Sequence, residues 1–372
     1  MPQLAARSAR LIVVSSLLAG AAAGIAAASP VASAAARTPL AARGVSAATG
    51  GALHGVAALS ARSAWAVGST ISGKPLILRW NGASWKQVPA PGLSGGLLYG
   101  VAAVSARSAW AVGSVGSTSS RALILHWNGV SWKRVPSPGP ARSSLSGVAA
   151  VSARSAWAVG TAGTKGLILH WNGTSWRRVA SPSPTFITSL SAVAAVSARS
   201  AWVVGTSFTD TSNNTLILRW NGRAWRRVAS PRPAAGAFLN GVAVSGRTAW
   251  AVGTIGCGCA PGGSLTLRWN GRAWKRVPSP APKGGAYLHS VTASPGGAWA
   301  VGSAFHSETT FKTVILRWNG RAWKLVPVPS PGANAGLSAV ASAGGRAWAV
   351  GYTGSKTLIV RWAGTAWKQA AS

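Results

Sequence analysis

The chain has 372 residues and an extreme charge balance, because 37 Lys and Arg face only 2 acidic residues and give a formal net charge of +35 at pH 7. Such a surface repels itself and attracts polyanions. Hydrolysis by paired acids needs two carboxyl groups that face one another across a bond, and Asp210 and Glu308 fall in different repeats, so the composition argues against that class of enzyme.

Residues 1–34 predict a secretory signal peptide. Arg7 and Arg10 precede an apolar stretch that starts at Leu11, and an Ala-Ser-Ala segment at its end offers a small-residue cleavage site. We therefore expect export and an extracellular location, with no membrane insertion after cleavage. An uncleaved anchor is the alternative, because the stretch is only marginally long enough to span a bilayer. Residues 35–50 follow as an Ala/Arg/Gly linker.

From Leu53 onward the same pattern occurs seven times, and each copy carries three tryptophans, which accounts for all 21 Trp. The first tryptophans of successive copies are 45 to 49 residues apart, a period that indicates a solenoid or a propeller. They are Trp65, Trp110, Trp157, Trp202, Trp250, Trp299 and Trp348.

Each copy predicts four short strands and no helix. In the first copy they cover residues 55–60, 63–70, 76–80 and 84–88, which are apolar or alternating runs separated by Gly, Pro, Ser and Asn. Asn-Gly lies between the second and third tryptophans in six copies, and it tolerates the positive φ of a tight antiparallel hairpin. The sequence thus predicts an all-β, seven-bladed β-propeller over residues 51–372, with four antiparallel strands per blade and the tryptophans between blades.

Arginines recur in the turns of the predicted blades. The turn between strands one and two and the turn between strands three and four lie on the same face of a propeller, so we expect a basic face that binds polyanions. The alternative is compositional drift in a genome that favours Arg codons. The predicted basic face consists of Arg62, Arg107, Arg154, Arg199, Arg247 and Arg346 in the first turn, and of Arg223, Arg272 and Arg321 after Asn-Gly.

Further cations fall on strand four, where we expect a solvated outer rim, since Lys on an edge strand discourages pairing with another chain. These cations are Lys86, Lys133, Arg134, Arg177, Arg178, Arg226, Arg227, Lys275, Arg276, Lys324 and Lys368.

A polar residue follows the opening leucine of every copy, at the start of the innermost strand. We expect these residues to ring the mouth of the central channel on the face opposite the arginines and to form a candidate ligand site. The alternative is a wet rim that tolerates any polar residue. The residues are His54, Tyr99, Ser146, Ser191, Asn240, His289 and Ser338.

Other chemistry finds little support in the sequence. Cys257 and Cys259 are candidates for a small disulfide that staples a loop, with free thiols or a soft-metal pair as alternatives. The sequence contains no nucleophile elbow, no phosphate-binding loop and no zinc-ligand spacing. With five histidines in all, we predict no metal site.

The patterns Leu-x-x-Val, WAVG and LILRWNGxxW, which extend over about residues 50–372, resemble the secreted β-propeller repeat proteins common in actinobacteria. They are more distantly similar to BNR/Asp-box and kelch-like propellers, which include sialidases, galactose oxidase and photosystem assembly factors. The resemblance implies the fold but no activity, because propellers host unrelated functions. The Asp of the Asp-box is missing before Trp80 and its counterparts, and no equivalent of the galactose oxidase copper site can be placed.

We therefore expect a secreted, monomeric propeller without catalytic residues or cofactor, acting as a binding or scaffolding module. The expected partner is an anionic polymer at the cell surface: wall-polymer phosphates, acidic polysaccharide or extracellular nucleic acid. Two alternatives stay open, namely a carbohydrate-active oxidase or lyase that uses the channel mouth, and a protein-interaction scaffold that binds partners through the variable loops joining strands two and three.

Overall fold

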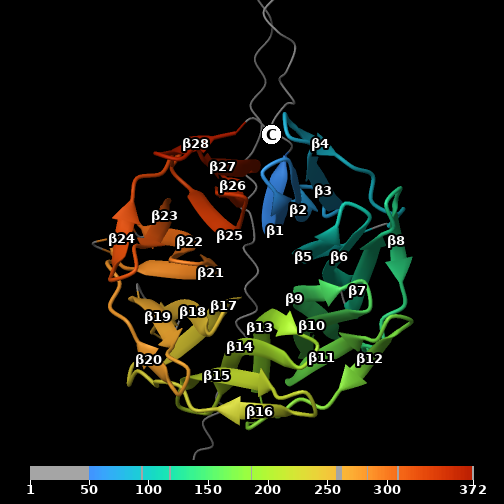
Figure 1. Cartoon of the computed structure of the whole chain (residues 1–372), viewed down its shortest axis with the longest axis horizontal. Helices are drawn as coiled ribbons and strands as arrows, with labels where there is room; N and C mark the ends of the chain where they lie inside the picture. The colour runs from blue at the N-terminus through green and yellow to red at the C-terminus, as the bar shows by residue number, and fades with distance from the viewer. Residues whose placement is uncertain are drawn as a thin grey trace, which may run out of the picture. The chain divides into compact units, whose positions relative to one another are not determined.

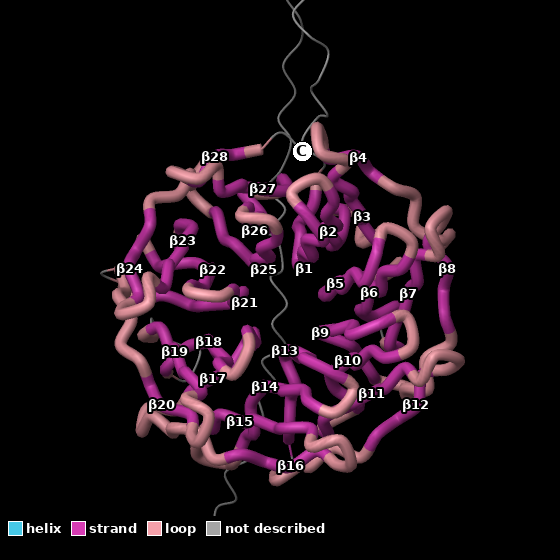
Figure 2. Tube along the Cα trace, viewed as in Figure 1, coloured by secondary structure: helices cyan, strands magenta, loops and turns pink. Residues whose placement is uncertain are grey.

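The computed structural model describes residues 50–370 apart from residues 94, 117–118, 186, 257–261, 283 and 308–309. Residues 44–372 form one compact unit. Its described part contains seven four-stranded antiparallel sheets arranged as blades around a common centre (Figure 1) and consists of strands and loops (Figure 2). The predicted seven-bladed β-propeller is confirmed. The predicted signal peptide, nearly all of the linker, both cysteines and Glu308 lie outside the described residues.

The strands follow one another from the centre of the ring to its rim in every blade. The inner strands are β1 (Gly51–Ser60), β5 (Leu97–Ser105), β9 (Ser143–Ser152), β13 (Ile187–Ser197), β17 (Ala237–Ser245), β21 (Ala286–Ser294) and β25 (Ala335–Ala343). The second strands are β2 (Ser63–Thr70), β6 (Ser108–Val115), β10 (Ser155–Ala162), β14 (Ser200–Phe208), β18 (Thr248–Ile255), β22 (Gly297–Phe305) and β26 (Arg346–Thr353).

The outer half of each blade is shorter. The third strands are β3 (Pro75–Trp80), β7 (Arg121–Trp127), β11 (Lys165–Trp171), β15 (Asn213–Trp220), β19 (Ser264–Trp269), β23 (Phe311–Trp318) and β27 (Lys356–Trp362). The rim strands are β4 (Trp85–Gln87), β8 (Trp132–Val135), β12 (Trp176–Val179), β16 (Trp225–Val228), β20 (Trp274–Arg276), β24 (Trp323–Val326) and β28 (Trp367–Gln369).

The tryptophans fill the seams between blades, as predicted. The first tryptophan of one blade contacts the second and third tryptophans of the next: Trp65 lies 5.0 Å from Trp127 and 5.1 Å from Trp132, with ring planes 58° and 82° apart. The same triad occurs at all seven seams. Burying one indole stabilises the fold by up to about 4–6 kcal/mol in area terms, so these triads are a principal source of cohesion between blades.

The ring closes between blades seven and one in the same way as elsewhere. Trp348 packs on Trp80 and Trp85, at 4.8 and 5.2 Å. The N–H of Gly51 donates to the carbonyl of Ser355 at 2.8 Å, which matches the bond from Gly96 N to Gly73 O between blades one and two. Each blade supplies its own four strands, so face packing closes the ring, together with one isolated bridge at residue 50.

Every inner strand contains a β-bulge at the same place. In β1, Leu53 pairs with Gly68 and Gly55 pairs with Val67, so His54 is the extra residue. The same shift follows the opening leucine in the other six blades. Bulges often re-aim a side chain beside a functional site. The seven polar residues predicted at the channel mouth are therefore the seven bulge residues.

The bulge explains the glycine at the end of each WAVG motif. A Cβ on Gly68 would lie 1.9 Å from the carbonyl oxygen of Ala52, the residue that precedes Leu53. The equivalent distance is 1.8 to 2.0 Å in all seven blades. Only a residue without a Cβ fits opposite the bulge, so this glycine is a steric requirement of strand pairing.

The hairpin between the third and rim strands is confirmed, but the asparagine acts differently from the prediction. Asn81 has no positive φ; the glycine after it does, at +101° for Gly82. The Asn81 Oδ1 atom accepts the N–H groups of Ala83 and Ser84, both at 2.9 Å. The Asn-Gly pair therefore forms an Asx turn within a four-residue loop, since Trp80 pairs directly with Trp85.

Candidate functional site

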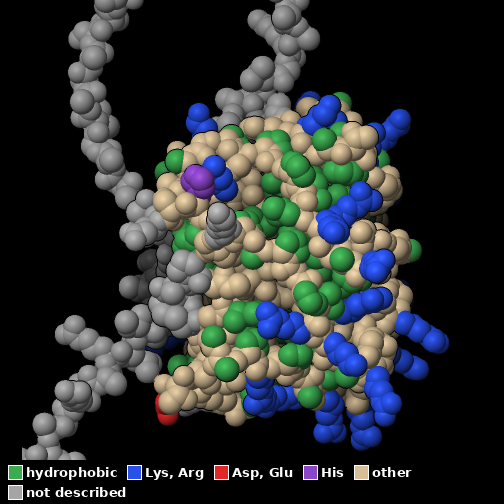
Figure 3. All heavy atoms as spheres, turned by 90° about the vertical axis from the view of Figure 1, so that its left-hand side faces the viewer, with side chains coloured by type: hydrophobic (Ala, Val, Ile, Leu, Met, Phe, Trp, Pro, Cys, Tyr) green, Lys and Arg blue, Asp and Glu red, His purple; other side chains and the backbone are tan. Residues whose placement is uncertain are grey.

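The nine arginines predicted to form a basic face lie at one end of the blades. Antiparallel order places the turn between the inner and second strands and the turn between the third and rim strands at the same end of each blade. All nine predicted arginines of these turns are exposed. Figure 3 shows Lys and Arg side chains gathered toward one face and along the rim. We call this surface the arginine face.

The first turn has two forms, which divide the arginine face into unequal parts. In blades one to four it reads Ser-Ala-Arg-Ser, and Ser60 Oγ accepts the N–H of Arg62 at 3.2 Å. The Arg62 side chain also covers the neighbouring hairpin, since a Cβ on Gly82 would meet Arg62 Cβ at 3.3 Å. The same bond and the same cover recur in blades two to four.

Blades five to seven carry glycine-containing first turns and lack the register shift that precedes the turn in blades one to four. Their hairpin glycines, Gly271, Gly320 and Gly364, have no neighbouring atom within 4 Å of the place that a Cβ would occupy, so no arginine covers them. Blade six has Pro295-Gly296 in place of the turn arginine. The first-turn arginine therefore covers the hairpin in blades one to four and leaves it uncovered in blades five and seven. Blade six lacks this arginine and contributes only Arg321 to the arginine face.

A row of basic residues crosses every blade, and the sequence reasoning missed its inner member, which is Arg in five blades and His in two. In blade one Trp65 pairs with Arg79, and Arg79 pairs with Lys86, so all three point to the same side of the sheet. The Arg79 guanidinium lies 5.2 Å from the Trp65 ring and 5.5 Å from the Trp127 ring of the next blade. Such cation–π contacts contribute about 0.5–2 kcal/mol.

The position of Arg79, directly before the second tryptophan, is Arg or His in all seven copies. This recurrence could have identified the position from the sequence. Arg219, Arg268, Arg317 and Arg361 stack over the seam in the same way. In blades two and three the residues are His126 and His170, whose rings lie 4.2 Å from Trp110 and Trp157. Burial lowers the pKa of both histidines.

These rows set like charges against one another. Five of them place two permanent cations directly opposite on the third and rim strands, for example Arg79 opposite Lys86 and Arg317 opposite Lys324. Like charges directly opposite on a sheet are destabilising. The one acidic residue within the described part of the chain, Asp210, is exposed in the loop between β14 and β15, at the opposite end of the blade. A bound anion would relieve this repulsion.

The bulge residues form a second candidate site around the ring centre. Asn240 Nδ2 donates to the carbonyl of Leu288 in the next blade at 2.9 Å, and the rings of His54 and Tyr99 lie 5.8 Å apart. His289 Nε2 lies 3.2 Å from Ser303 Oγ. Among the described residues, no contact joins His54 to His289, the two histidines of this set.

The two histidines of this set have lowered pKa values. Desolvation by the surrounding strands lowers the pKa of His54. Desolvation by the surrounding protein lowers the pKa of His289 from 6.5 to about 4, although the residue keeps an exposed surface. Both rings are therefore neutral hydrogen-bonding groups at pH 7. The described residues contain no group of three or more His, Cys, Asp or Glu side chains that could hold a metal ion.

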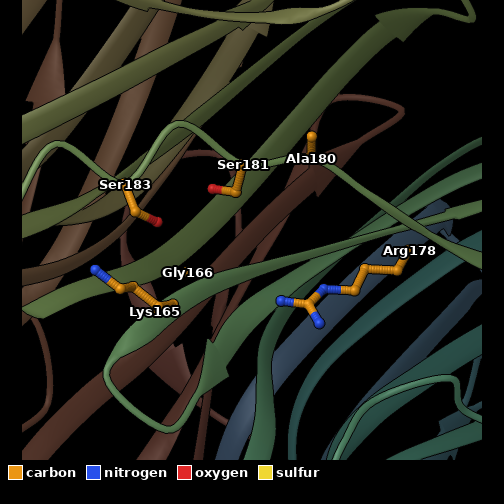
Figure 4. A pocket seen from close by; sticks show the side chains of 6 residues that line it. All are labelled: Lys165, Gly166, Arg178, Ala180, Ser181 and Ser183. Atoms are coloured by element: carbon orange, nitrogen blue, oxygen red, sulfur yellow. The ribbon is translucent and has the colours of Figure 1, made fainter.

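Two hollows of about 530 Å³ each lie in the described surface. One opens at the end of blade three opposite the arginine face, where Figure 4 shows Ser181 and Ser183 above Lys165, with Arg178 across from them. The Lys165 ammonium donates to the carbonyl of Thr185 at 3.2 Å. The other hollow lies on the arginine face at blade six.

Within residues 50–370, the part that is described with a few gaps, no helix has the length and apolar composition needed to cross a bilayer. No family model and no curated protein matches the chain.

Among solved structures, the chain is similar to YCF48 bound to D1 peptide, with a TM-score of 0.57 and 14% identity over 84% of this chain and 92% of that chain. It is also similar to YCF48 from Cyanidioschyzon merolae, with a TM-score of 0.55 and 17% identity over 85% and 97% of the two chains. A GH74 xyloglucanase from Xanthomonas campestris is similar with a TM-score of 0.57 and 19% identity, over 86% of this chain but only 53% of that chain. At these identities the likeness shows the propeller fold and not a shared activity.

Proposed function

We propose that the protein is a non-catalytic binding scaffold for anionic polymers, which it contacts with the arginine face and the adjoining rim. The observation that supports the proposal is that cations lie directly opposite cations on the third and rim strands of five blades. Asp210, the one acidic residue in the described part of the chain, lies at the other end of its blade. Such a charge pattern costs stability in the free protein and favours a polyanion that neutralises it. The proposal includes an extracellular location, for which the predicted signal peptide is the support, and a monomeric protein.

The test is the salt dependence of binding to a duplex DNA and of retention on heparin. Replacing the six first-turn arginines by Ser removes up to six phosphate contacts, and each contact contributes about −0.9 to the slope of log affinity against log salt. We expect the slope to become shallower by about 5 units. The six replaced residues are Arg62, Arg107, Arg154, Arg199, Arg247 and Arg346.

A matched control removes the same charge from the opposite end of the blades. Its six exposed cations are Lys74, Arg121, Arg142, Arg232, Lys312 and Lys356, all replaced by Gln. We expect this variant to keep most of the slope. Equal losses in the two variants would show that net charge alone attracts the polymer, and a wild-type slope near zero would remove the proposal.

A second candidate function is a peptide or protein scaffold. It is favoured by the similarity to YCF48, one structure of which holds a bound D1 peptide, and by the polar bulge residues, which offer neutral donors and acceptors at the ring centre. A partner captured from the cell surface that stays bound at high salt, and is lost on replacing Asn240 by Ala, would support this function over the polyanion scaffold. The enzyme hypothesis has its own test, in metal analysis of the purified protein and in the variants His54→Ala and His289→Ala.

A further inference from the structure

Blade six differs from the other blades at the arginine face. Six of the seven first tryptophans are at most 3% exposed, whereas Trp299 is only half-buried. The turn beside it carries Pro295-Gly296 instead of arginine. A hollow of about 530 Å³ opens at this interruption, lined by that turn and by Trp299, Trp318, Arg317, Asn319 and Lys324. We call it the blade-six pocket.

The pocket is rich in hydrogen-bond donors. In blades one to four the second tryptophan donates its indole N–H to an alanine carbonyl in the first turn, as Trp80 does to Ala61 at 3.2 Å. No described residue accepts the equivalent bond from Trp318, although that side chain is 7% exposed. The Trp318 indole nitrogen is not among the buried unpaired indole nitrogens of the described residues, so it reaches the surface of the pocket, where a ligand can accept its hydrogen bond.

The remaining polar groups of the pocket donate as well. Asn319 Oδ1 already accepts the N–H groups of Arg321 and Ala322, which leaves its amide NH₂ to donate. Arg317 and Lys324, directly opposite one another on β23 and β24, bring two positive charges that have no described acidic partner. The complementary ligand carries a carboxylate or similar anion and several oxygen acceptors.

Base stacking fits this pocket poorly. The Arg317 guanidinium lies 5.2 Å from the Trp299 ring and 5.6 Å from the Trp362 ring, and the two indoles lie 4.9 Å apart. The faces of Trp299 are thus already engaged, whereas binding of single-stranded nucleic acid relies on free aromatic faces. The volume lies in the range of small-ligand sites and suits one or two sugar rings.

We propose that the blade-six pocket binds an acidic sugar residue, so that the polymer held by the arginine face is an acidic polysaccharide. Its carboxylate pairs with Arg317 and Lys324, and its hydroxyl groups accept from Trp318 and Asn319. This inference rests on the proposed function, because the pocket interrupts the same basic face, and it selects one polymer class from those that the charge alone allows.

The experiment compares two oligomers that each carry six negative charges, a hexagalacturonate and a heptathymidylate without a terminal phosphate, by calorimetry at fixed salt. The wild-type protein should bind the hexagalacturonate at least about fivefold more tightly. Lys324→Gln should weaken that binding about fivefold or more, because it removes a pocket cation. Lys275→Gln removes the same charge from the equivalent position of blade five, outside the pocket, and should weaken binding less than twofold.

A second variant adds a positive charge instead of removing one, and so distinguishes binding in the pocket from general charge attraction. Gly297 lines the pocket and occupies the position of Arg346 in blade seven, and its Cβ would meet nothing closer than 3.5 Å. Gly297→Arg adds a positive charge but fills the pocket, so it should weaken hexagalacturonate binding at least about tenfold while heparin retention stays unchanged or increases.

Tighter hexagalacturonate binding by Gly297→Arg, equal losses in the Lys324 and Lys275 variants, or preference for the heptathymidylate would each overturn the pocket while heparin retention still upholds the proposed function. If the wild-type protein instead shows no salt-dependent binding to any polyanion, the proposed function itself is wrong.

Discussion

The glycine opposite the β-bulge allows a direct test of the steric requirement in the pairing of the inner and second strands. In Gly113→Ala the new methyl carbon would lie 1.8 Å from the carbonyl oxygen of Leu97. Carbon–oxygen contacts in sheets are normally about 3.3–3.6 Å, so β5 and β6 must separate by about 1.5 Å or the bulge must flatten. Overpacking costs about 1–3 kcal/mol, and the weakened ladder bonds add about 1 kcal/mol each. We expect a total loss of about 3–5 kcal/mol.

The measurement is thermal unfolding followed by tryptophan fluorescence and calorimetry. About 320 ordered residues at roughly 2.1 cal/mol/K each give an unfolding entropy near 0.67 kcal/mol/K, so the expected loss lowers Tm by about 4–7 °C. Gly92→Ala is the matched control, because its Cβ would meet nothing within 4 Å and its φ is not positive. If Gly113→Ala unfolds within about 1 °C of that control, the steric account of the motif glycine is wrong.

Three further predictions concern the hairpins, the ring centre and the seams. Ala363→Asn should raise stability by about 1 kcal/mol, because it supplies the Asx turn that only blade seven lacks, and an unchanged or lower Tm would contradict this. The His289 ring should titrate near pH 4 by NMR, and a midpoint near 6.5 would refute this prediction. Because the unfolded chain binds this proton at higher pH than the folded protein does, the free energy of unfolding should fall as the pH drops from 6.5 toward 4. Trp110→Ala should cost about 3–5 kcal/mol in denaturant unfolding and Trp299→Ala clearly less, because Trp110 is 1% exposed and Trp299 is half-buried; equal costs would contradict the packing argument.

The blade count, the strand order and the place of the tryptophans could all be predicted from the sequence. Strand two was predicted at residues 63–70, and the structure has β2 at Ser63–Thr70. These features follow from local signals, namely apolar runs, turn residues and a fixed period. The position of the turn arginines on one face also follows, because antiparallel strands alternate direction and bring every second turn to the same side.

Contacts between residues far apart in the chain could not be predicted in this way. The sequence shows a polar residue after each opening leucine and a glycine in each WAVG motif, but only the pairing of β1 with β2 reveals that the first is a bulge residue and the second its steric partner. The role of the Arg or His before each second tryptophan likewise depends on rings at the seam, such as Trp127 of the neighbouring blade, which lies 5.5 Å from the Arg79 guanidinium.

The sequence by itself thus determined the architecture of this protein and the face that carries its charge, because periodicity and turn chemistry act within a few residues. Tertiary structure alone decided the cation rows, the neutral histidine at the ring centre and the opening at blade six. Each of these depends on strand register or on the packing of one blade against the next, as at blade six, where Trp299 is half-buried while the six equivalent tryptophans are buried.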